Sequence, residues 1–440
     1  TIGFYMHAGE FGFGIEAEFL LVDKNTYEPF SHRNLDFDSL LKLINSIPCD
    51  DFSMDGLNIK PLHTKAIPYL IEGYSLTDAD MKTISLLPKG IEARTPMAPT
   101  IDKSVRDLKI LFDRLRVHCL KSNYDLSILS HHPNEPKFNA PPNYKRHDYW
   151  QWALTATTTF GPDINISVPE ELSKRINRSK LNGRINHYMP SAIAMSLASP
   201  ISEGKLWQFR GQSGKSIRTF RRSLWAPIFY VHEKPALRFE FKGFEMATCL
   251  EDYNVYFLLS LALLLDDSLS EEAGDETKLY DLGSISLNGL DSIHTREIAK
   301  RVMESAEKMA SQFGFKRDGM DEFWNRIESR HLPADDIIDL FNEKQSVPYV
   351  LSKRSNLYYS DVESVQELSQ RSSTFDLEAG DHRSAALPGS STETLPTISS
   401  KHDSPNEEPS ESSKGQVRDS STAAPSAERE LNLQLPGGSK

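Results

Sequence analysis

A short strand-like segment near the N-terminus constrains the fold most, because it places two carboxylates inside an apolar run. The segment Phe11–Asp23 reads FGFGIEAEFLLVD. Successive side chains of a strand point to opposite faces, so Glu16 and Glu18 share one face. The other face holds the apolar residues Ile15, Ala17, Phe19 and Leu21. The pattern predicts a strand that buries one face and gathers negative charge on the other.

Three later segments repeat this pattern: Gly90–Thr95 (GIEART), Pro162–Pro169 (PDINISVP) and Leu237–Glu245 (LRFEFKGFE). Taken singly, each segment is also what an amphipathic strand with one face in water looks like. As a set, the four segments each offer at least one carboxylate on the polar face, namely Glu16, Glu18, Glu92, Asp163 and Glu240.

If these strands share one sheet, their carboxylates converge on one face. Mutual repulsion would then raise their pKa values unless cations lie among them. Hard divalent cations take oxygen ligands of this kind, and Mg²⁺ commonly bridges protein carboxylates and nucleotide phosphates. The sequence predicts that the carboxylates are ligands of Mg²⁺.

A basic segment could supply the anion-binding partners of such a site. Phe209–Trp225 reads FRGQSGKSIRTFRRSLW and holds the densest basic cluster of the chain: Arg210, Lys215, Arg218, Arg221 and Arg222. Guanidinium groups recognise phosphate and carboxylate through paired hydrogen bonds. A P-loop is excluded, because the position where GxxxxGK[ST] begins holds Phe209. A solvated basic loop is the alternative, although Trp207, Phe220 and Trp225 favour a packed one.

Composition divides the chain into two parts. After about Gln370 it becomes rich in Ser, Thr, Pro, Glu and Gly, and such a segment buries too little apolar surface to offset chain entropy. We therefore expect a folded domain over residues 1–360 and a disordered tail over 361–440. Helical periodicity in the domain predicts helices over Asp102–Asn123, Asp252–Leu265 and Thr295–Phe313, the second central and the others amphipathic.

Net charge and cysteine content indicate which kinds of partner and which cellular compartment the protein favours. The net charge of −12 argues against nucleic acid or an anionic membrane as the main partner. The longest apolar run, Val255–Leu265, is too short to span a bilayer. Three cysteines without a CxxC pair fit a reducing compartment, so a cytoplasmic location is expected. Sheet edges that must be covered make a homo-oligomer reasonable.

At this point the motifs resemble a known family. GIEAEFLLVD, GIEARTP, SHHP, INISVP, MPSAIAMSLASPISEG, SIRT and LRFEFKGFE occur in an order similar to that of glutamate-cysteine ligase family 2, the carboxylate-amine ligases of the glutamine-synthetase-like superfamily. The resemblance covers about Gly12 to Leu265, with a helical continuation to about residue 355. It implies an α+β fold whose curved antiparallel sheet holds ATP and magnesium on its concave face, with helices packed on the convex face.

The resemblance also implies a reaction. ATP phosphorylates a substrate carboxylate, typically the γ-carboxylate of glutamate, and an amine attacks the acyl phosphate to give an amide. Phosphoryl transfer depends mainly on positioning and charge neutralisation, which agrees with the predicted metal and arginine groups. The implied partners are small amino acid and amine substrates.

Individual residues take roles by the same resemblance. Glu16, Glu18, Glu92 and Glu240 match the family's metal ligands, and Arg218 in SIRT matches an arginine expected near phosphate or a substrate carboxylate. Catalytic roles are expected for Arg218, Glu240 and Lys242; nucleotide-binding roles for Arg210, Lys215, Arg221, Arg222 and Arg238; and metal-binding roles for Glu16, Glu18, Glu92, Asp163, Asn165 and Glu240. His131 and His132 match the family's HP turn, where a structural role is favoured over a ligand role.

Two positions depart from the family pattern. Asp163 and Asn165 stand where the family has H-x-H or H-x-N, and Lys242 stands where E-x-R is common. Aspartate remains a hard donor for Mg²⁺, whereas lysine loses the bidentate fork of arginine. These departures leave two alternatives open: a non-catalytic binding or regulatory protein that keeps the fold, and a kinase that differs only in the acceptor of the phosphoryl group.

Overall fold

The structure is a computed structural model that describes residues 11–54, 57–78, 80, 82–138, 157–222, 228–232, 237–270 and 282–358. Contacts divide the chain into a unit from Thr1 to Asp381 and a second unit from His382 to Lys440, and every described residue lies in the first. The predicted tail, 361–440, and Trp225 lie outside the described residues.

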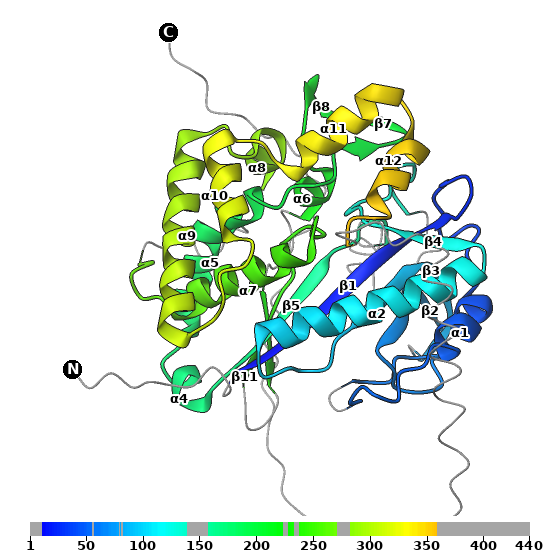
Figure 1. Cartoon of the computed structure of the whole chain (residues 1–440), viewed down its shortest axis with the longest axis horizontal. Coiled ribbons are helices and arrows are strands. Elements are labelled where there is room, and N and C mark those ends of the chain that lie inside the picture. The colour runs from blue at the N-terminus through cyan, green and yellow to red at the C-terminus, as the bar shows by residue number, and fades with distance from the viewer. Residues whose placement is uncertain are drawn as a thin grey trace, which may run out of the picture. The chain divides into compact units, whose positions relative to one another are not determined.

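A seven-stranded antiparallel sheet organises the described residues (Figure 1). The strands follow the order β10-β11-β5-β1-β3-β2, and β4 pairs with the C-terminal part of β1. The sheet curls into a half-barrel, as expected. Its strands are β1 (Gly12–Asp23), β2 (Tyr69–Thr77), β3 (Thr83–Arg94), β4 (Tyr124–Ser127), β5 (Pro162–Val168), β10 (Ile228–His232) and β11 (Leu237–Phe241). Two small hairpins pair β6 (Ile201–Ser202) with β7 (Lys205–Leu206) and β8 (Gln208–Phe209) with β9 (Gln212–Ser213).

The four carboxylate-bearing segments are confirmed as strands β1, β3, β5 and β11 of this one sheet. One boundary is wrong: β11 ends at Phe241 and does not continue to Glu245. Beyond it the chain turns into the helical layer, where Gly243 packs against Met189 and Ile193 so closely that a Cβ atom would lie 2.7 Å from the Met189 methyl carbon. Glu245 is then fully buried and accepts a hydrogen bond from the backbone N–H of Ala198 (2.8 Å).

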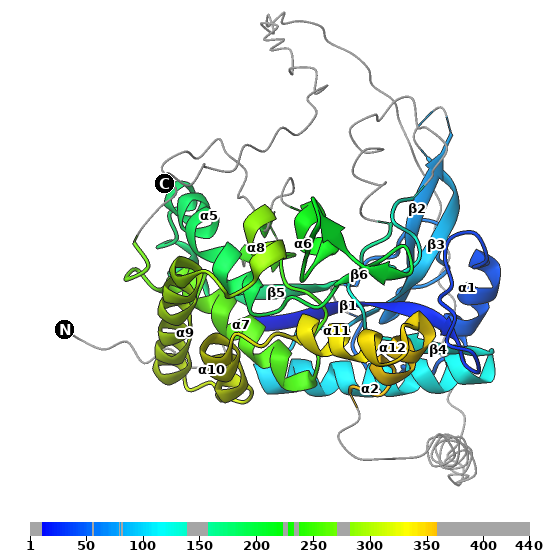
Figure 2. The same cartoon turned by 90° about the horizontal axis from the view of Figure 1, so that it is seen from above.

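Helices surround the sheet, and Figure 2 shows α2 running beneath β1. The helices predicted over 102–123, 252–265 and 295–313 are confirmed as α2, α7 and α9. Thr100 and Ser292 cap the N-termini of α2 and α9 with their side chains, as such residues commonly do. The helices are α1 (Phe37–Asn45), α2 (Ile101–Lys121), α4 (Glu170–Ser173), α5 (Arg178–Ala194), α6 (Ile217–Arg222), α7 (Leu250–Leu265), α8 (Gly283–Asn288), α9 (Ile293–Phe313), α10 (Met320–Ser329), α11 (Pro333–Lys344) and α12 (Val347–Arg354).

The core lies between the apolar face of the sheet and two of these helices. Phe13 of β1 meets Phe257 of α7 with ring centroids 5.3 Å apart, and Phe19 meets Phe112 of α2 at 5.1 Å. Both β1 residues are fully buried. Since strand side chains alternate, this packing directs Glu16 and Glu18 to the face opposite α2 and α7.

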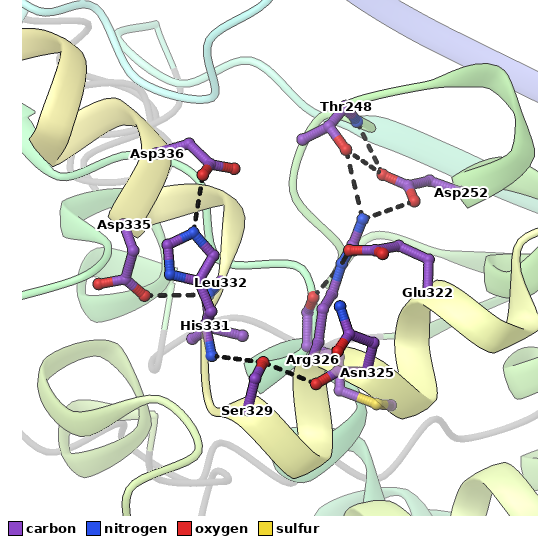
Figure 3. A network of polar contacts seen from close by, with 11 residues as sticks. Thr248, Asp252, Glu322, Asn325, Arg326, Ser329, His331, Leu332, Asp335 and Asp336 are labelled. Carbon is purple, nitrogen blue, oxygen red and sulfur yellow. Dashed lines mark hydrogen bonds and ion pairs between the residues drawn. The ribbon is translucent and has the colours of Figure 1, made fainter.

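An ion pair inside the helical layer ties α10 to α7. Arg326 of α10 donates a hydrogen bond of 2.8 Å to Asp252 near the start of α7, and both side chains are buried (Figure 3). The same guanidinium donates to the carbonyl oxygen of Met195, which follows α5. Removing one member of such a pair leaves a buried charge uncompensated, which makes this contact a strong constraint on the layer. None of the described helices has the length and apolar composition needed to traverse a lipid bilayer.

Replacing Phe13 with alanine tests the packing of β1 on the helices. The change deletes an aromatic side chain that is fully buried, and such deletions cost about 3–5 kcal/mol of unfolding free energy. We expect a lower midpoint of urea unfolding, followed by tryptophan fluorescence. The control is Ile59→Ala, which removes a side chain with 60% of its area exposed and should change stability by no more than about 0.5 kcal/mol. Equal effects of the two substitutions would contradict the assigned core.

Candidate functional site

Strand register places the predicted carboxylates on one face of the sheet. Glu16 of β1 pairs with Asp163 of β5, and Glu18 pairs with Glu92 of β3. Glu240 of β11 pairs with Asn165, two residues along β5 from Asp163. Because the strands are in register, residues two apart return to the same face, and side chains from four strands converge there.

The carboxylates separate into two groups of three. The Glu16 group contains Glu16, Asp163 and Glu240, and the Glu18 group contains Glu18, Glu72 and Glu92. Within each group one oxygen of every side chain lies within 4.8 Å of the others. That spacing brings three carboxylates within reach of a single cation.

Burial and mutual repulsion raise the pKa values of two carboxylates in the Glu18 group. Burial, followed by the charges of neighbouring carboxylates, raises the pKa of Glu92 well above its ordinary value. Burial also raises the pKa of Glu72, against the lowering effect of Lys89. Among the residues that the structure describes, none donates a hydrogen bond to Glu72 or Glu92. Glu92 is buried and Glu72 is half-buried. Carboxylates that no protein group donates to are what a Mg²⁺ site requires, so this group fits the ion.

Glu18 itself is held from both sides. The ammonium of Lys89, a buried residue of β3, donates 2.8 Å hydrogen bonds to Glu18 Oε1 and to the carbonyl oxygen of Thr159. The backbone N–H of Gly161 donates to Glu18 Oε2 at 3.1 Å. These contacts fix the Glu18 carboxylate at the edge of its group.

The Glu16 group differs, because a lysine lies within it. The Lys242 ammonium donates a hydrogen bond to Asp163 and forms an ion pair with Glu240. Burial alone would lower the pKa of Lys242, but the carboxylates, Asp163 first, raise it above its ordinary value. Burial raises the pKa of Glu16 to about 7, and Asp163 adds to the increase. This group does not fit a divalent ion in the same way, because the chain supplies a cation to two of its three members.

Two neighbours of the Glu16 group pair with each other. Arg238 of β11 donates a hydrogen bond to the side-chain oxygen of Asn165, which is buried. Asn165 belongs to neither carboxylate group. Its oxygen is engaged by a guanidinium, so its expected role as a metal ligand stays a prediction, as does nucleotide binding by Arg238.

Arg218 is the member of the basic segment that reaches the sheet. It lies in α6 and is 2% exposed, and its guanidinium donates to the carbonyl oxygens of Gly243 (3.2 Å) and Lys242 (3.5 Å). Its Nε has no hydrogen-bond partner among the described residues. Burial, with Arg222, lowers the pKa of Arg218 to about 10, which leaves the side chain cationic at neutral pH. A buried cation with an unused donor is suited to an anionic ligand.

The other basic residues are spread over separate places. Lys215 forms an ion pair with Asp335, whose other oxygen accepts from the backbone N–H of Leu332 at 2.9 Å (Figure 3). Arg221 donates to the carbonyl oxygen of Pro136 and approaches His131 Nε2 at 3.1 Å. The structure places Arg210 in the exposed β8–β9 turn and leaves Arg222 half-buried in α6. The expected cluster therefore does not assemble as one phosphate cradle, although its packed character is confirmed by Trp207 and Phe220, whose ring centroids lie 5.2 Å apart.

A structural role is expected for both histidines of SHHP, and each is buried in the described structure. His132 Nδ1 accepts backbone hydrogen bonds from Asn134 (3.2 Å) and Glu135 (3.0 Å), and burial lowers its pKa to about 4. His131 is fully buried, and burial lowers its pKa well below the ordinary value.

Sequence reasoning missed four residues of the site: Glu72, Lys89, Gly161 and Glu245. Glu72 has a weak signal, a single glutamate after the apolar run Tyr69–Ile71. Gly161 leaves room for the Arg218 guanidinium, because a Cβ atom there would lie 2.0 Å from Arg218 Nη2. Glu245 accepts hydrogen bonds from Ser199 (2.8 Å), Ser216 and Thr219 (2.6 Å), and the last two flank Arg218.

Comparison with known proteins agrees with this arrangement. The model of glutamate-cysteine ligase family 2 matches residues 12–225. A solved complex of the prokaryotic ubiquitin-like protein Pup with its ligase PafA shares the fold at a TM-score of 0.51 and 11% identity, covering 87% of this chain and 86% of the other. Glutamate–cysteine ligase from Francisella tularensis, solved with AMP, gives a TM-score of 0.50 and 11% identity, covering 86% and 95%. No curated protein sequence matches the chain.

The raised pKa of Glu92 makes a prediction about stability. A carboxyl whose pKa is raised on folding binds more protons folded than unfolded, so stability falls as pH rises above the ordinary value of 4.5. Glu92→Gln keeps the shape without the charge. In the presence of EDTA we expect the variant to have a higher melting temperature than the unaltered protein at pH 8, on the order of 3 °C for each kcal/mol of unfolding free energy gained. The difference in melting temperature should disappear as the pH falls towards 4.5.

Thermal melts across this pH range measure the gap. Glu328→Gln, which removes an exposed carboxylate, is the control and should show no such pH dependence. A Glu92→Gln variant that melts below the unaltered protein at every pH would show that the Glu92 charge is compensated without a metal.

Proposed function

We propose that the protein is an ATP- and Mg²⁺-dependent carboxylate-amine ligase, on the premise that the model of glutamate-cysteine ligase family 2 matches residues 12–225. The observation that carries the proposal is the Glu18 group, in which three carboxylates converge without donors to Glu72 and Glu92 among the described residues. Burial of negative charge on this scale is costly unless a cation compensates it, and a structure maintains it where function needs the cation.

The proposed reaction has two steps. A substrate carboxylate oxygen attacks the γ-phosphorus of ATP, and the bond to the bridging oxygen breaks to release ADP. The amine nitrogen then attacks the acyl carbon, the carbon–oxygen bond to phosphate breaks, and the amine gives up a proton as the amide forms. The γ-carboxylate of glutamate is our proposed first substrate, and the amine is left open.

The chain's own residues have distinct roles in this proposal. Glu18, Glu72 and Glu92 would hold Mg²⁺, which when bound would neutralise charge on the phosphates of ATP. Arg218 would donate its unused Nε–H to an anionic oxygen of the phosphoryl group or of the substrate. The carboxylates lie on strands of one sheet, and Arg218 is held by the carbonyl oxygens of Lys242 and Gly243 directly after β11. Their spacing is therefore fixed before substrate arrives, which lowers the cost of positioning.

The two similar solved structures are named for different substrates, so they do not identify the amine acceptor. One is named for glutamate and cysteine, and the other for the protein Pup. We propose a small amine as the acceptor here and treat a protein amine as the alternative within the same reaction class. Nucleotide-binding roles for Arg210, Lys215, Arg221, Arg222 and Arg238 remain part of the proposal, and they are secondary to Arg218 because Lys215, Arg221 and Arg238 contact other protein groups.

A non-catalytic binding protein with the same fold is the second candidate. One observation favours it: the Lys242 ammonium contacts two carboxylates of the Glu16 group, which lessens the need of that group for an external cation. Such a protein could bind nucleotide without turning it over. The two candidates differ in ADP release.

The first test measures ADP release with glutamate and a panel of amines, with and without Mg²⁺. We expect release that requires both Mg²⁺ and an amine, and amide formation in equal amount. Glu92→Gln should reduce kcat about 10²–10³-fold, because it removes a ligand of the ion that stabilises the transferring phosphoryl group.

Glu328→Gln serves as the matched control, because it removes an exposed carboxylate outside both groups and should leave the rate unchanged. ATP binding that is insensitive to Glu92→Gln, with no ADP release from any amino acid and amine pair, would replace the ligase proposal with the binding-protein one.

A further inference from the structure

The two carboxylate groups contain the same number of carboxylates and differ in how a lysine contacts them. Each contains three carboxylates, and in each a lysine ammonium forms an ion pair with the group, Lys242 in the Glu16 group and Lys89 in the Glu18 group. From the placement of these ammonium groups we propose that Lys242 takes the place of a divalent ion in the Glu16 group, so that in the absence of nucleotide the sheet binds one divalent ion, in the Glu18 group.

Local structure directs Lys242 into its group. The last paired position of β11 with β5 is Phe241 opposite Ile164, so Lys242 follows directly and lies next to Asp163. It is also two residues after Glu240, and its ammonium forms ion pairs with both Glu240 and Asp163. The chain thus sets the lysine beside two carboxylates by backbone placement.

The position of the ammonium excludes an ion. Lys242 Nζ is bound to Asp163 and to Glu240, two of the three oxygen donors of the group. Mg²⁺ would need the same oxygens at about 2.0–2.1 Å, in the space that the ammonium fills. A divalent ion and an ammonium within a few ångström also repel each other strongly where water is excluded. One of the two must leave before the other binds.

Lys89 lies differently. Its ammonium contacts Glu18 at the edge of the Glu18 group and donates to the backbone oxygen of Thr159, at 2.8 Å in each case. Its Nζ also lies 5.5 Å from the centre of the Phe160 ring. Glu72 and Glu92 receive no hydrogen bond from any described residue, so their oxygens stay available to an ion. The Glu18 group therefore has space for a divalent ion, whereas the Lys242 ammonium occupies the corresponding space in the Glu16 group.

This inference deepens the proposed function and rests on it, because it concerns which cations serve the same sheet face. It explains why the two departures from the family pattern, Asp163 and Lys242, occur in the same chain. The carboxylate of Asp163 is the ion-pair partner that the Lys242 ammonium requires. It also predicts that each chain binds one divalent ion with high affinity before nucleotide binds, and that this ion serves the reaction.

Counting bound Mn²⁺ tests the inference. Mn²⁺ takes the same oxygen ligands as Mg²⁺, and its electron paramagnetic resonance signal reports the free ion. Without nucleotide, the full chain should bind one Mn²⁺ with high affinity. Lys242→Met, which keeps an unbranched side chain without the terminal ammonium, should bind two. Lys242→Gln is the second variant, for use if the methionine variant does not fold as judged by circular dichroism.

Lys89→Met is the matched control. It removes the same charge beside the Glu18 group, where the ion is already expected, so the count should stay at one. Glu92→Gln should reduce the count of the unaltered chain from one to none and that of Lys242→Met from two to one. Zero or two high-affinity ions on the unaltered chain, or one ion still on a folded Lys242 variant, would overturn the inference. ADP release is not part of this count, so failure of the ligase proposal would be recognised separately by the turnover assay.

Discussion

Repulsion among six carboxylates on one sheet face is the constraint on which the rest of the structure depends. Glu16, Glu18, Glu72, Glu92, Asp163 and Glu240 converge there from five strands. The opposite face is packed against α2 and α7 by fully buried aromatic rings, so the sheet cannot relieve the repulsion by separating its strands. The charge has to be balanced in place, which leaves Lys89, Lys242 and a bound ion as the means of doing so.

The strands and the main helices could be predicted because their signals are local. A period of two in FGFGIEAEFLLVD specifies which side chains share a face, and β1 has that arrangement. Helical periodicity similarly gave α2, α7 and α9 within a few residues. The end of β11 was not accessible in this way, because it depends on Gly243 meeting Met189 and Ile193 of another element.

The missing parts of the site depend on pairing between distant strands. Glu72 joins the group only because β2 pairs with β3 beside Glu92, and a register shift follows directly after it at Gly73. Gly73 has no room for a side chain, since a Cβ atom would lie 2.1 Å from the carbonyl oxygen of Leu87. The prediction of one basic cluster was wrong for a related reason. Its residues are neighbours in sequence, but Lys215 pairs with α11 and Arg221 contacts the loop at Pro136.

The position of Arg218 shows how these distant pieces act together. Glu245 binds Ser216 and Thr219, the residues on either side of Ile217 and Arg218, and so holds the start of α6 against the end of the sheet. Gly161 leaves the space in which the guanidinium lies, and its N–H donates to Glu18 of the neighbouring carboxylate group. One glycine thus contacts both the proposed anion-binding residue and a proposed metal ligand. A side chain at this position would displace the Arg218 guanidinium. Gly161 therefore sets how closely the cationic part of the site approaches the carboxylates, and a reaction that depends on positioning requires such a fixed approach.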